Sequence, residues 1–316
     1  MRRYIPHLVV IIFAAWCAYA LRGDLAQVSL APALRSWDLV VAACLLSLVN
    51  YGLRILRWRS YLARLGYPLP YRFAALTFVA GFAYTLSPGK VGEMVRARYY
   101  VPLGVPLTKV AGAFFAERLL DLVAMIVLAA LLFAGSAQYR GWIVGAAVLV
   151  TVALFMLALL PWNRISTAVR ATEKIPSLIR KTLGSGTSAL AATQPLLRPA
   201  PLAFGFVLAM LAWGLEGVGL NVLGGMLPGV HLDVGTSMGI YAIAVLIGGL
   251  SFLPGGLGST EAVMTTLLAT HGFPVGDAIF LTLACRLVTL WLAVVLGWLA
   301  VVLLRQRTLA VVQPWQ

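Results

Sequence analysis

Long apolar segments separated by short polar stretches recur along the whole chain. A helix of roughly 20 apolar residues is long enough to cross a hydrocarbon core of about 30 Å. Each apolar segment is therefore predicted to be a helix at membrane depth. The segments cover about 6–21, 38–53, 71–87, 110–134, 141–160, 202–227, 235–253 and 277–304.

Lysine and arginine residues between these segments predict how the chain threads the membrane. Basic residues collect in loops on the cytoplasmic side, so all the basic groups are predicted to lie there. The groups are Arg2 with Arg3; Arg54, Arg57, Arg59, Arg64 and Arg72; Arg164, Arg170, Lys174, Arg180, Lys181 and Arg198; and Arg305 with Arg307.

The segment 71–87 is predicted to enter the membrane without crossing it. If every apolar segment crossed fully, the basic group that begins at Arg164 would lie outside, against the usual distribution of charge. The conflict disappears if 71–87 enters from the cytoplasm, turns at Ser87-Pro88-Gly89 and returns along 91–103. Residues 71–103 are therefore predicted to form a re-entrant hairpin.

A second re-entrant hairpin is predicted from the same reasoning in the second half of the chain. Residues 235–253 enter from the outside, turn near Pro254-Gly255-Gly256 and return along 259–271. The predicted fold is an all-α integral membrane protein with about six full transmembrane helices and two re-entrant helical hairpins. The hairpins enter from opposite faces, and both termini are cytoplasmic.

The two hairpins also match in sequence. The first reads "LSPGKVGE" and the second "LPGGLGSTE", and in both a Pro-Gly turn is followed by another Gly and a Glu. Glu93 precedes Arg118 by 25 positions, and Glu261 precedes Arg286 by 25 positions. Hairpins of opposite orientation predict an inverted-topology repeat, which is common in transporters. Its halves are 1–134 and 141–305, in a single membrane domain of residues 1–316 with a basic cytoplasmic loop at 162–198.

Composition supports a membrane protein: 61% of the residues are hydrophobic, 11% are charged, and the mean hydropathy is +0.94. In a soluble protein the net charge of +14 would suggest nucleic acid. Here cytoplasmic loops and attraction to anionic lipid explain the net charge better, and no nucleic-acid partner is expected.

The N-terminus could be a signal peptide, since Arg2 and Arg3 precede an apolar run and Ala18-Tyr19-Ala20. An uncleaved first span is favoured because the second half needs a counterpart.

Cysteine and histidine give no sign of a metal site, a disulfide framework or a cofactor. The cysteines all lie in apolar segments, and the histidines have no spacing typical of metal ligands. These residues are Cys17, Cys44 and Cys285, and His7, His231 and His271.

The two turns are predicted to form a binding site. Irregular backbone at membrane depth is tolerated where it is buried in protein or lines a wet cavity. A helix that starts after such a turn directs free N–H groups toward an anion. The predicted turn residues are Pro88, Gly89, Gly92, Pro254, Gly255, Gly256 and Gly258.

Ionisable residues near these turns are costly in lipid and therefore suggest a function. The substrate-binding candidates are Ser87, Lys90, Arg96, Arg98, Arg118, Ser259, Thr260 and Arg286. The acids predicted to orient these residues or to take up protons are Glu93, Glu117, Asp121, Glu216 and Glu261. The same charges could instead be structural ion pairs that hold the hairpins in place. Arg118 and Arg286 are favoured for phosphate, because they occupy equivalent positions and a guanidinium forks onto oxyanions.

The run "SPGKVGEMVRARYY", followed by "ERLLDL" and "PGGLGSTEA", resembles the lysylphosphatidylglycerol synthase transmembrane family, also called flippase-like, over about residues 5–304. The family includes the membrane part of the multiple peptide resistance factors, which flips an aminoacyl-phospholipid made by a separate C-terminal domain. The resemblance implies lipid translocation or handling. Since twelve residues follow Leu304, we expect no aminoacyl-transferase domain and carry no synthase activity over. The matching positions are Pro88, Gly89, Gly92, Glu93, Arg96, Glu117, Arg118, Asp121, Pro254, Gly255, Gly256, Gly258 and Glu261.

The leading hypothesis is a lipid flippase of the bacterial inner membrane, with no catalytic residues, whose partners are lipids with anionic headgroups. The lipid would be a phospholipid, an aminoacyl-phospholipid or a polyprenyl-linked glycolipid. Gly89-Lys90 is followed by Val91, so no phosphate loop for ATP is present. Transport would then run downhill or couple to protons through Glu93, Glu117 or Asp121. The alternatives are a membrane-embedded lipid-modifying enzyme and a scaffold subunit that partners a lipid- or glycan-synthesis enzyme.

Overall fold

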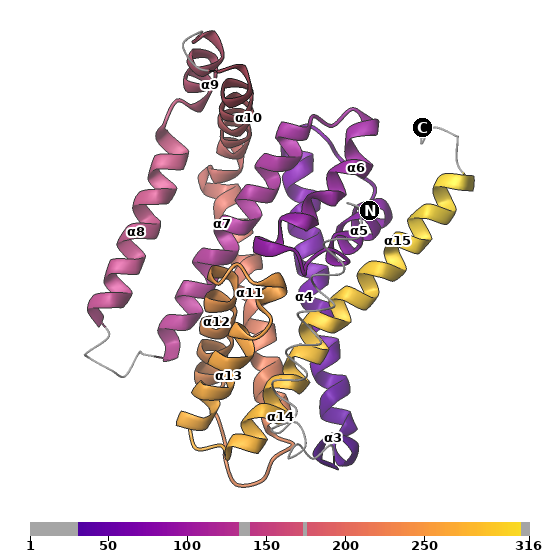
Figure 1. Ribbon diagram of the computed structural model, residues 1–316, viewed down its shortest axis with the longest axis vertical. Helices are drawn as coiled ribbons and strands as arrows, with labels where there is room; N and C mark the ends of the chain where they lie inside the picture. The colour runs from indigo at the N-terminus through magenta and orange to yellow at the C-terminus, as the bar shows by residue number, and fades with distance from the viewer. Residues whose placement is uncertain (1–30, 133–139, 173–175, 311–316) are drawn as a thin grey trace.

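The computed structural model describes residues 31–132, 140–172 and 176–310, and every regular element in these ranges is a helix. The prediction of an all-α protein is confirmed for this part of the chain (Figure 1). The first elements are α3 (Ala31–Arg35), α4 (Trp37–Arg64), α5 (Tyr71–Phe82), η1 (Pro88–Arg96), α6 (Ala97–Tyr100), η2 (Val101–Leu103), α7 (Leu107–Leu132) and α8 (Arg140–Leu159). They are followed by α9 (Trp162–Ala171), α10 (Ser177–Thr193), η4 (Gln194–Leu197), α11 (Pro199–Gly224), α12 (Val234–Leu250), η5 (Pro254–Gly256), α13 (Ser259–Thr270), α14 (Val275–Arg286), η6 (Leu287–Trp291) and α15 (Leu292–Ala310).

Three stretches of the described chain are long and apolar enough to cross a membrane. They are α4, α11 and the continuous helix Val275–Arg305, which α14, the π-helical η6 and α15 form together. A fourth is present if Val148–Leu159 and Trp162–Ala171, which meet at a bend of 67°, count as one span. The predicted first span, 6–21, lies outside the described residues.

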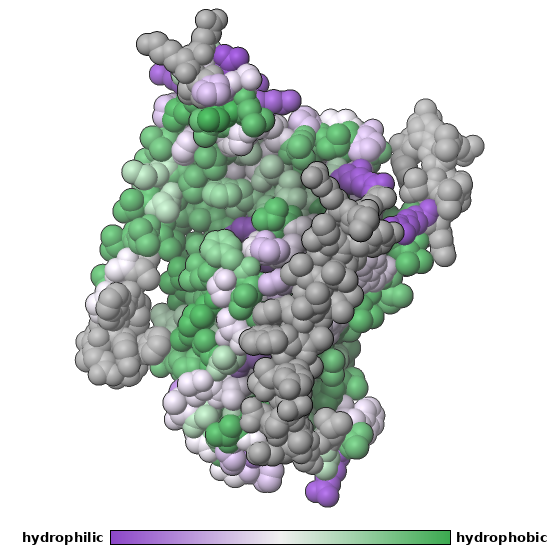
Figure 2. All heavy atoms as spheres, in the orientation of Figure 1, coloured by the Kyte–Doolittle hydropathy of each residue, from purple (hydrophilic) through white to green (hydrophobic). Residues whose placement is uncertain are grey.

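The outer surface of these helices is apolar, as contact with lipid acyl chains requires. Large exposed side chains include Leu149 of α8, Leu211 of α11 and Leu299 of α15. Figure 2 shows hydrophobic residues along the sides of the helices and hydrophilic residues at the ends. Soluble proteins rarely expose apolar patches of this extent, so the surface is that of a membrane protein.

The two turn regions predicted from the sequence meet in the interior. Figure 1 shows α12 and α13 running side by side between one end of the molecule and its middle, and α5 lying in the opposite half. The tips are so close that a Cβ atom on Gly255 would lie 2.6 Å from Leu86 Cδ2. The site described below is built around this contact.

The return arm of the first hairpin differs from the second. Where 91–103 was predicted to return as a helix, the chain forms the 3₁₀ segments η1 and η2 around the single turn α6. Gly89 and Lys90 have φ values of 60° and 56°, which are outside the helical region. Behind them, Ser87 Oγ accepts a hydrogen bond of 2.6 Å from the N–H of Gly92. These local constraints tighten the arm, whereas α13 is a regular helix.

The prediction that 162–198 is a loop is wrong, because the segment contains α9, α10 and η4. Pro176 stands at the N-cap of α10, where its fixed φ of −50° is compatible with a helix start. Gly184 packs against the side chain of Arg170. The glycines of α10 are therefore tolerated within a helix that is held by its neighbour α9.

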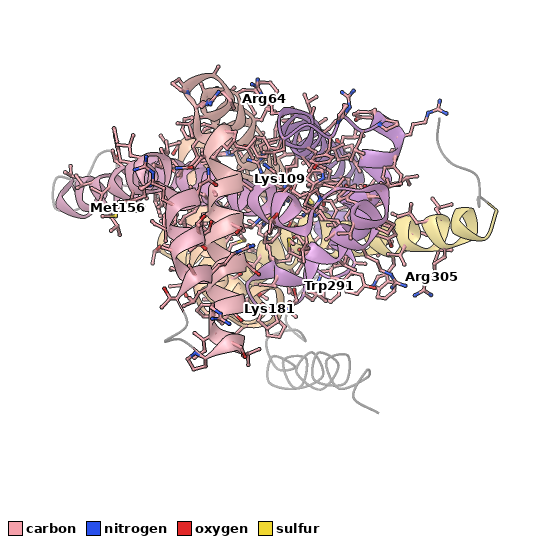
Figure 3. The ribbon with its side chains drawn as sticks, turned by 90° about the horizontal axis from the view of Figure 1, so that it is seen from above. Arg64, Lys109, Met156, Lys181, Trp291 and Arg305 are labelled. Atoms are coloured by element: carbon pink, nitrogen blue, oxygen red, sulfur yellow. The ribbon has the colours of Figure 1, made fainter. Side chains whose placement is uncertain are left out.

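The basic segments gather at one end of the molecule. The C-terminal end of α4, the pair α9 and α10, and the C-terminal end of α15 all lie at the upper end in Figure 1. Figure 3 views this end from above, with Arg64, Lys181 and Arg305 spread around its edge. This distribution is compatible with the predicted threading of the chain.

Glycines allow the closest helix crossings. A Cβ atom on Gly217 of α11 would lie 2.5 Å from Met238 Cα of α12. On α15, a Cβ atom at Gly297 would overlap Ala83 N and lie 2.7 Å from the carbonyl carbon of Phe82. Small residues of this kind are typical of helix contacts in membranes, where close backbone approach replaces the hydrophobic effect.

We predict that Gly297→Ala destabilises the protein by about 1–3 kcal/mol, because the added methyl group collides with backbone that cannot move aside easily. Thermal unfolding of the purified protein in detergent measures the effect. Gly52→Ala in α4 is the matched control, since no atom lies within 4 Å of its added Cβ. A melting temperature equal to that of the control would show that α15 does not depend on this contact.

Candidate functional site

A cluster of buried charges lies where α4, η1 and α7 meet. Every member is at least nine-tenths buried except Arg118, whose side chain is 20% exposed. The members are Arg54 and Arg57 from α4, Glu93 and Arg96 from η1, and Glu117, Arg118 and Asp121 from α7.

Arg96 is a structural residue in this arrangement. Its Nη2 lies 2.8 Å from Glu93 Oε2, its Nη1 lies 3.1 Å from Glu117 Oε2, and its Nε donates to the Glu93 carbonyl oxygen. The guanidinium also lies 4.3 Å from the ring centroid of Trp58. With no exposed surface and its donors occupied, Arg96 holds η1 against α7 and is not free to bind a substrate.

The charge pattern predicted that Arg54 and Arg57 belong to a cytoplasmic basic group. The structure instead places both side chains in the protein interior. Arg57 is fully buried, with Nη2 at 2.6 Å from Asp121 Oδ1 and 3.6 Å from Glu117 Oε1. Arg54 Nη2 lies 3.6 Å from the same Glu117 oxygen. Both belong to the interior because α4 is 28 residues long and continues well past the apolar segment 38–53.

Arg118 connects the acids of the cluster to a cavity. Its Nη2 lies 3.4 Å from Glu93 Oε2, 3.1 Å from Glu117 Oε1 and 3.4 Å from Asp121 Oδ2. Its Nε is buried and has no hydrogen-bond partner among the described residues. Arg118 is therefore the guanidinium of this cluster that can meet a ligand.

The second hairpin has its own ion pair. Arg286 Nε lies 2.6 Å from Glu261 Oε1, and its Nη2 donates to the carbonyl oxygen of Gly255 at 2.8 Å. The second oxygen of Glu261 accepts from the N–H of Gly258, which satisfies the start of α13. Glu93–Arg118 and Glu261–Arg286, which the sequence places at equal spacing, are thus both in contact.

A cavity of about 190 Å³ lies between the two hairpin tips. Its polar wall is made by Ser87, Lys90, Arg118, Asp121, Thr260 and Arg286, with the turn residues Gly89, Gly255 and Gly256. Its apolar wall is made by Leu122, Met125, Val245, Leu246, Leu250, Leu253 and Leu290. The cavity therefore offers cations and apolar side chains to the same ligand.

Lys90 is the least constrained cation on this wall. It forms no ion pair in the part of the chain that the structure describes, and its Nζ lies 5.3 Å above the ring of Trp213. Its backbone adopts φ 56°, which is rare for a residue other than glycine. A positively charged group held at a hairpin tip without a carboxylate is available for an anion.

A smaller cavity of about 50 Å³ adjoins the first and shares Lys90, Trp213 and Arg286 with it. Glu216 of α11 lies in its wall, where Ser47 Oγ donates to Oε2 at 3.0 Å and Asn50 Nδ2 donates to Oε1. Glu216 thus lies beside the cluster and apart from the arginine–carboxylate pairs.

The remaining predicted site residues differ in whether they reach the cavity, and of these only Thr260 lines it. Arg98 is exposed on α6 and is not brought to it. Ser259 Oγ contacts Ser251 Oγ at 2.9 Å, and Thr260 is buried against Gly248 and Gly256. The turn residues Pro88, Gly92, Pro254 and Gly258 shape the tips but do not line the cavity.

Sequence reasoning missed Arg54, Arg57, Ser47 and Asn50 as site residues. A signal was present, because positions 47, 50, 54 and 57 follow one another at intervals of three or four. This spacing places them on one face of a helix. A polar stripe of this kind along a membrane helix points to the protein interior.

Known proteins resemble the chain along most of its length. Residues 7–297 match the family described as "Lysylphosphatidylglycerol synthase TM region". The chain belongs to this family. The chain is also similar in sequence to the "UPF0104 membrane protein" of Methanothermobacter thermautotrophicus. The two are 27% identical over 281 residues, which cover 83% of this chain and 82% of that protein.

For this member of the lysylphosphatidylglycerol synthase TM region family, we predict that Arg57→Gln costs about 3–5 kcal/mol of stability, because it leaves buried carboxylates without a partner. Combining it with Asp121→Asn should cost less than the sum of the two single changes. Thermal unfolding of the four proteins in detergent gives the coupling. Arg59→Gln on the exposed side of α4 is the control, and strict additivity would contradict the buried pair.

Proposed function

We propose that this protein is a lipid flippase, which moves an anionic or phosphate-bearing lipid between the leaflets of the bacterial inner membrane. The observation that supports this most directly is the cavity, where Lys90, Arg118 and Arg286 face an apolar wall at the contact of the two hairpin tips. The name of the matched family also refers to lipid chemistry.

The balance of buried charge favours an anionic ligand. Around the first hairpin tip the basic residues are Arg54, Arg57, Lys90, Arg96 and Arg118, and the acids are Glu93, Glu117 and Asp121. Even with Glu216 added to the acids, the bases remain in excess. Uncompensated charge at membrane depth is costly, and a phosphate in the cavity would offset it.

The dimensions of the cavity fit a headgroup and not a whole lipid. Its volume of about 190 Å³ is below the roughly 300–1,000 Å³ of sites that enclose drug-sized ligands. At its edge, Leu122 is 39% exposed and Leu250 is 69% exposed. We infer that the headgroup enters between these side chains while the acyl chains stay in the bilayer.

The proposed architecture follows the inverted repeat. Residues 1–134 and 141–305 are the two halves, α5–η1 and α12–α13 are their re-entrant hairpins, and both termini are cytoplasmic. In this scheme α7, which has 26 residues, also crosses the membrane despite its charges. Rocking of one half against the other around the hairpin tips would expose the headgroup site to each leaflet in turn.

Transport is favoured over lipid chemistry by the state of the acids. Glu93, Glu117 and Asp121 are each ion-paired with arginine. Proton transfer to or from any of them would disrupt a buried ion pair, which makes them poor candidates for a general acid or base. We therefore propose that the cavity binds and releases its lipid unchanged.

We predict that Lys90→Gln slows translocation at least about tenfold, since one charge-assisted hydrogen bond contributes roughly 1.5–3 kcal/mol to binding. The measurement is dithionite quenching of fluorescently labelled phosphatidylglycerol in proteoliposomes. Arg118→Ala and Arg286→Ala are expected to abolish translocation in the same assay.

Lys181→Gln is the matched control for Lys90→Gln, because it removes the same charge from the exposed surface of α10 (Figure 3). The control should translocate at the wild-type rate. A wild-type rate from folded Lys90→Gln would contradict the proposed headgroup site.

If the hairpins are re-entrant, as proposed, the first and last residues of each hairpin lie on the same side of the membrane. Single cysteines placed at the exposed positions Arg72 and Leu103 should react with an impermeant maleimide from the cytoplasmic side in membrane vesicles. Cysteines at the exposed positions His231 and His271 should react from the opposite side. Labelling of Arg72→Cys and Leu103→Cys from different sides would mean that the first hairpin crosses fully.

A further inference from the structure

Glu216 differs from the other buried acids near the cavity. It is 3% exposed, and its oxygens accept hydrogen bonds from the neutral groups of Ser47 and Asn50 on α4. Among the described residues it forms no ion pair, whereas Glu93, Glu117, Asp121 and Glu261 all do. Its charge is thus not fixed by a guanidinium.

The groups that hold Glu216 can serve both of its protonation states. A guanidinium only donates hydrogen bonds, but a hydroxyl and a side-chain amide both donate and accept. Asn50 Oδ1 is buried and has no hydrogen-bond partner in the described chain. Turning the amide over would present this oxygen to a protonated Glu216, and desolvation favours the neutral form of a carboxyl group. The site can therefore hydrogen-bond Glu216 in its protonated form as well as in its ionised form.

Glu216 is also placed to sense the ligand. It lines the smaller cavity with Lys90 and Arg286, which line the headgroup cavity as well. The charged and titratable groups that face it are Tyr51 and Arg54 from α4, Lys90 from η1, Tyr241 from α12, and Cys285 and Arg286 from α14. When Glu216 is ionised, it offsets part of the positive charge that would attract an anion.

We infer that Glu216 is the proton-binding residue of the transporter, protonated while an anionic headgroup occupies the cavity and ionised when the cavity is empty. A proton from water forms an O–H bond with a carboxylate oxygen of Glu216 as the headgroup enters, so the headgroup charge replaces the carboxylate charge. The proton returns to water when the headgroup leaves. The anion and the proton therefore favour each other's binding to the same degree. This inference rests on the proposed function for the identity of the anion.

The assignment changes the expected path of proton coupling. The sequence placed Glu216 among five acids that could orient the cations or take up protons, but it named Glu93, Glu117 and Asp121 for the coupling. Each of these three carboxylates lies within 3.1 Å of an arginine nitrogen. Protonating any of them would break an ion pair that holds the fold. Protonating Glu216 breaks none.

Binding of a fluorescent short-chain phosphatidylglycerol to the full-length protein in nanodiscs tests the coupling. For the wild type, the dissociation constant should rise with pH, by up to about tenfold per pH unit where Glu216 titrates, since one proton is linked to one anion. Glu216→Gln should bind at all pH values as tightly as the wild type does at low pH. Asp38→Asn, an exposed acid in the first turn of α4, should keep the wild-type profile.

A wild-type pH profile in Glu216→Gln would overturn the inference. So would binding by the wild type that does not change with pH.

Infrared spectroscopy tests the proton site without any lipid. A pH titration should show the carbonyl stretch of a buried protonated carboxyl group in the wild type and in Asp38→Asn, and its loss in Glu216→Gln. Identical spectra for the wild type and Glu216→Gln would overturn the proton site. Loss of the signal together with no lipid binding at any pH would support the proton site and overturn the proposed lipid function, so the two failures are distinguishable.

Discussion

The carboxylate of Glu117 joins the three elements from which the site is built. One oxygen lies 3.1 Å from Arg96 of η1, and the other lies 3.1 Å from Arg118 of α7 and 3.6 Å from both Arg54 and Arg57 of α4. A carboxylate buried at this depth is costly unless it is paired. The positions of α4 and of the first hairpin relative to α7 therefore depend on satisfying this one group.

Much of the fold follows from the distribution of apolar residues, because each long helix must present an apolar surface to lipid. The segments 110–134 and 202–227 correspond to α7 and α11. The failure at 162–198 has a physical reason: α9 and α10 support each other, and Gly184 packs on Arg170. A contact between two helices overrides the local preference of a glycine, and no pattern within one segment reveals it.

The site was predictable where its geometry is local and unpredictable where it depends on packing. The equal spacing of Glu93–Arg118 and Glu261–Arg286 served in the sequence only as evidence of a repeat, and in the structure the residues of each pair are in contact. Burial of the other cations could not be inferred in this way. Residues 96 and 98 are both arginine in a polar run, but one is fully buried while Arg98 is exposed, because only one side of this tight segment faces α7.

The charges of α7 have a consequence for how the protein is made. Glu117, Arg118 and Asp121 lie near the middle of the helix, and each would cost about 2.5–3.5 kcal/mol at the centre of a lone helix in the bilayer. The arginines of α4 that neutralise these acids come earlier in the chain, so they are synthesised first. If α7 spans the membrane, as proposed above, α4 would be in place when α7 leaves the ribosome, and the order of the helices along the chain would also be an order of assembly.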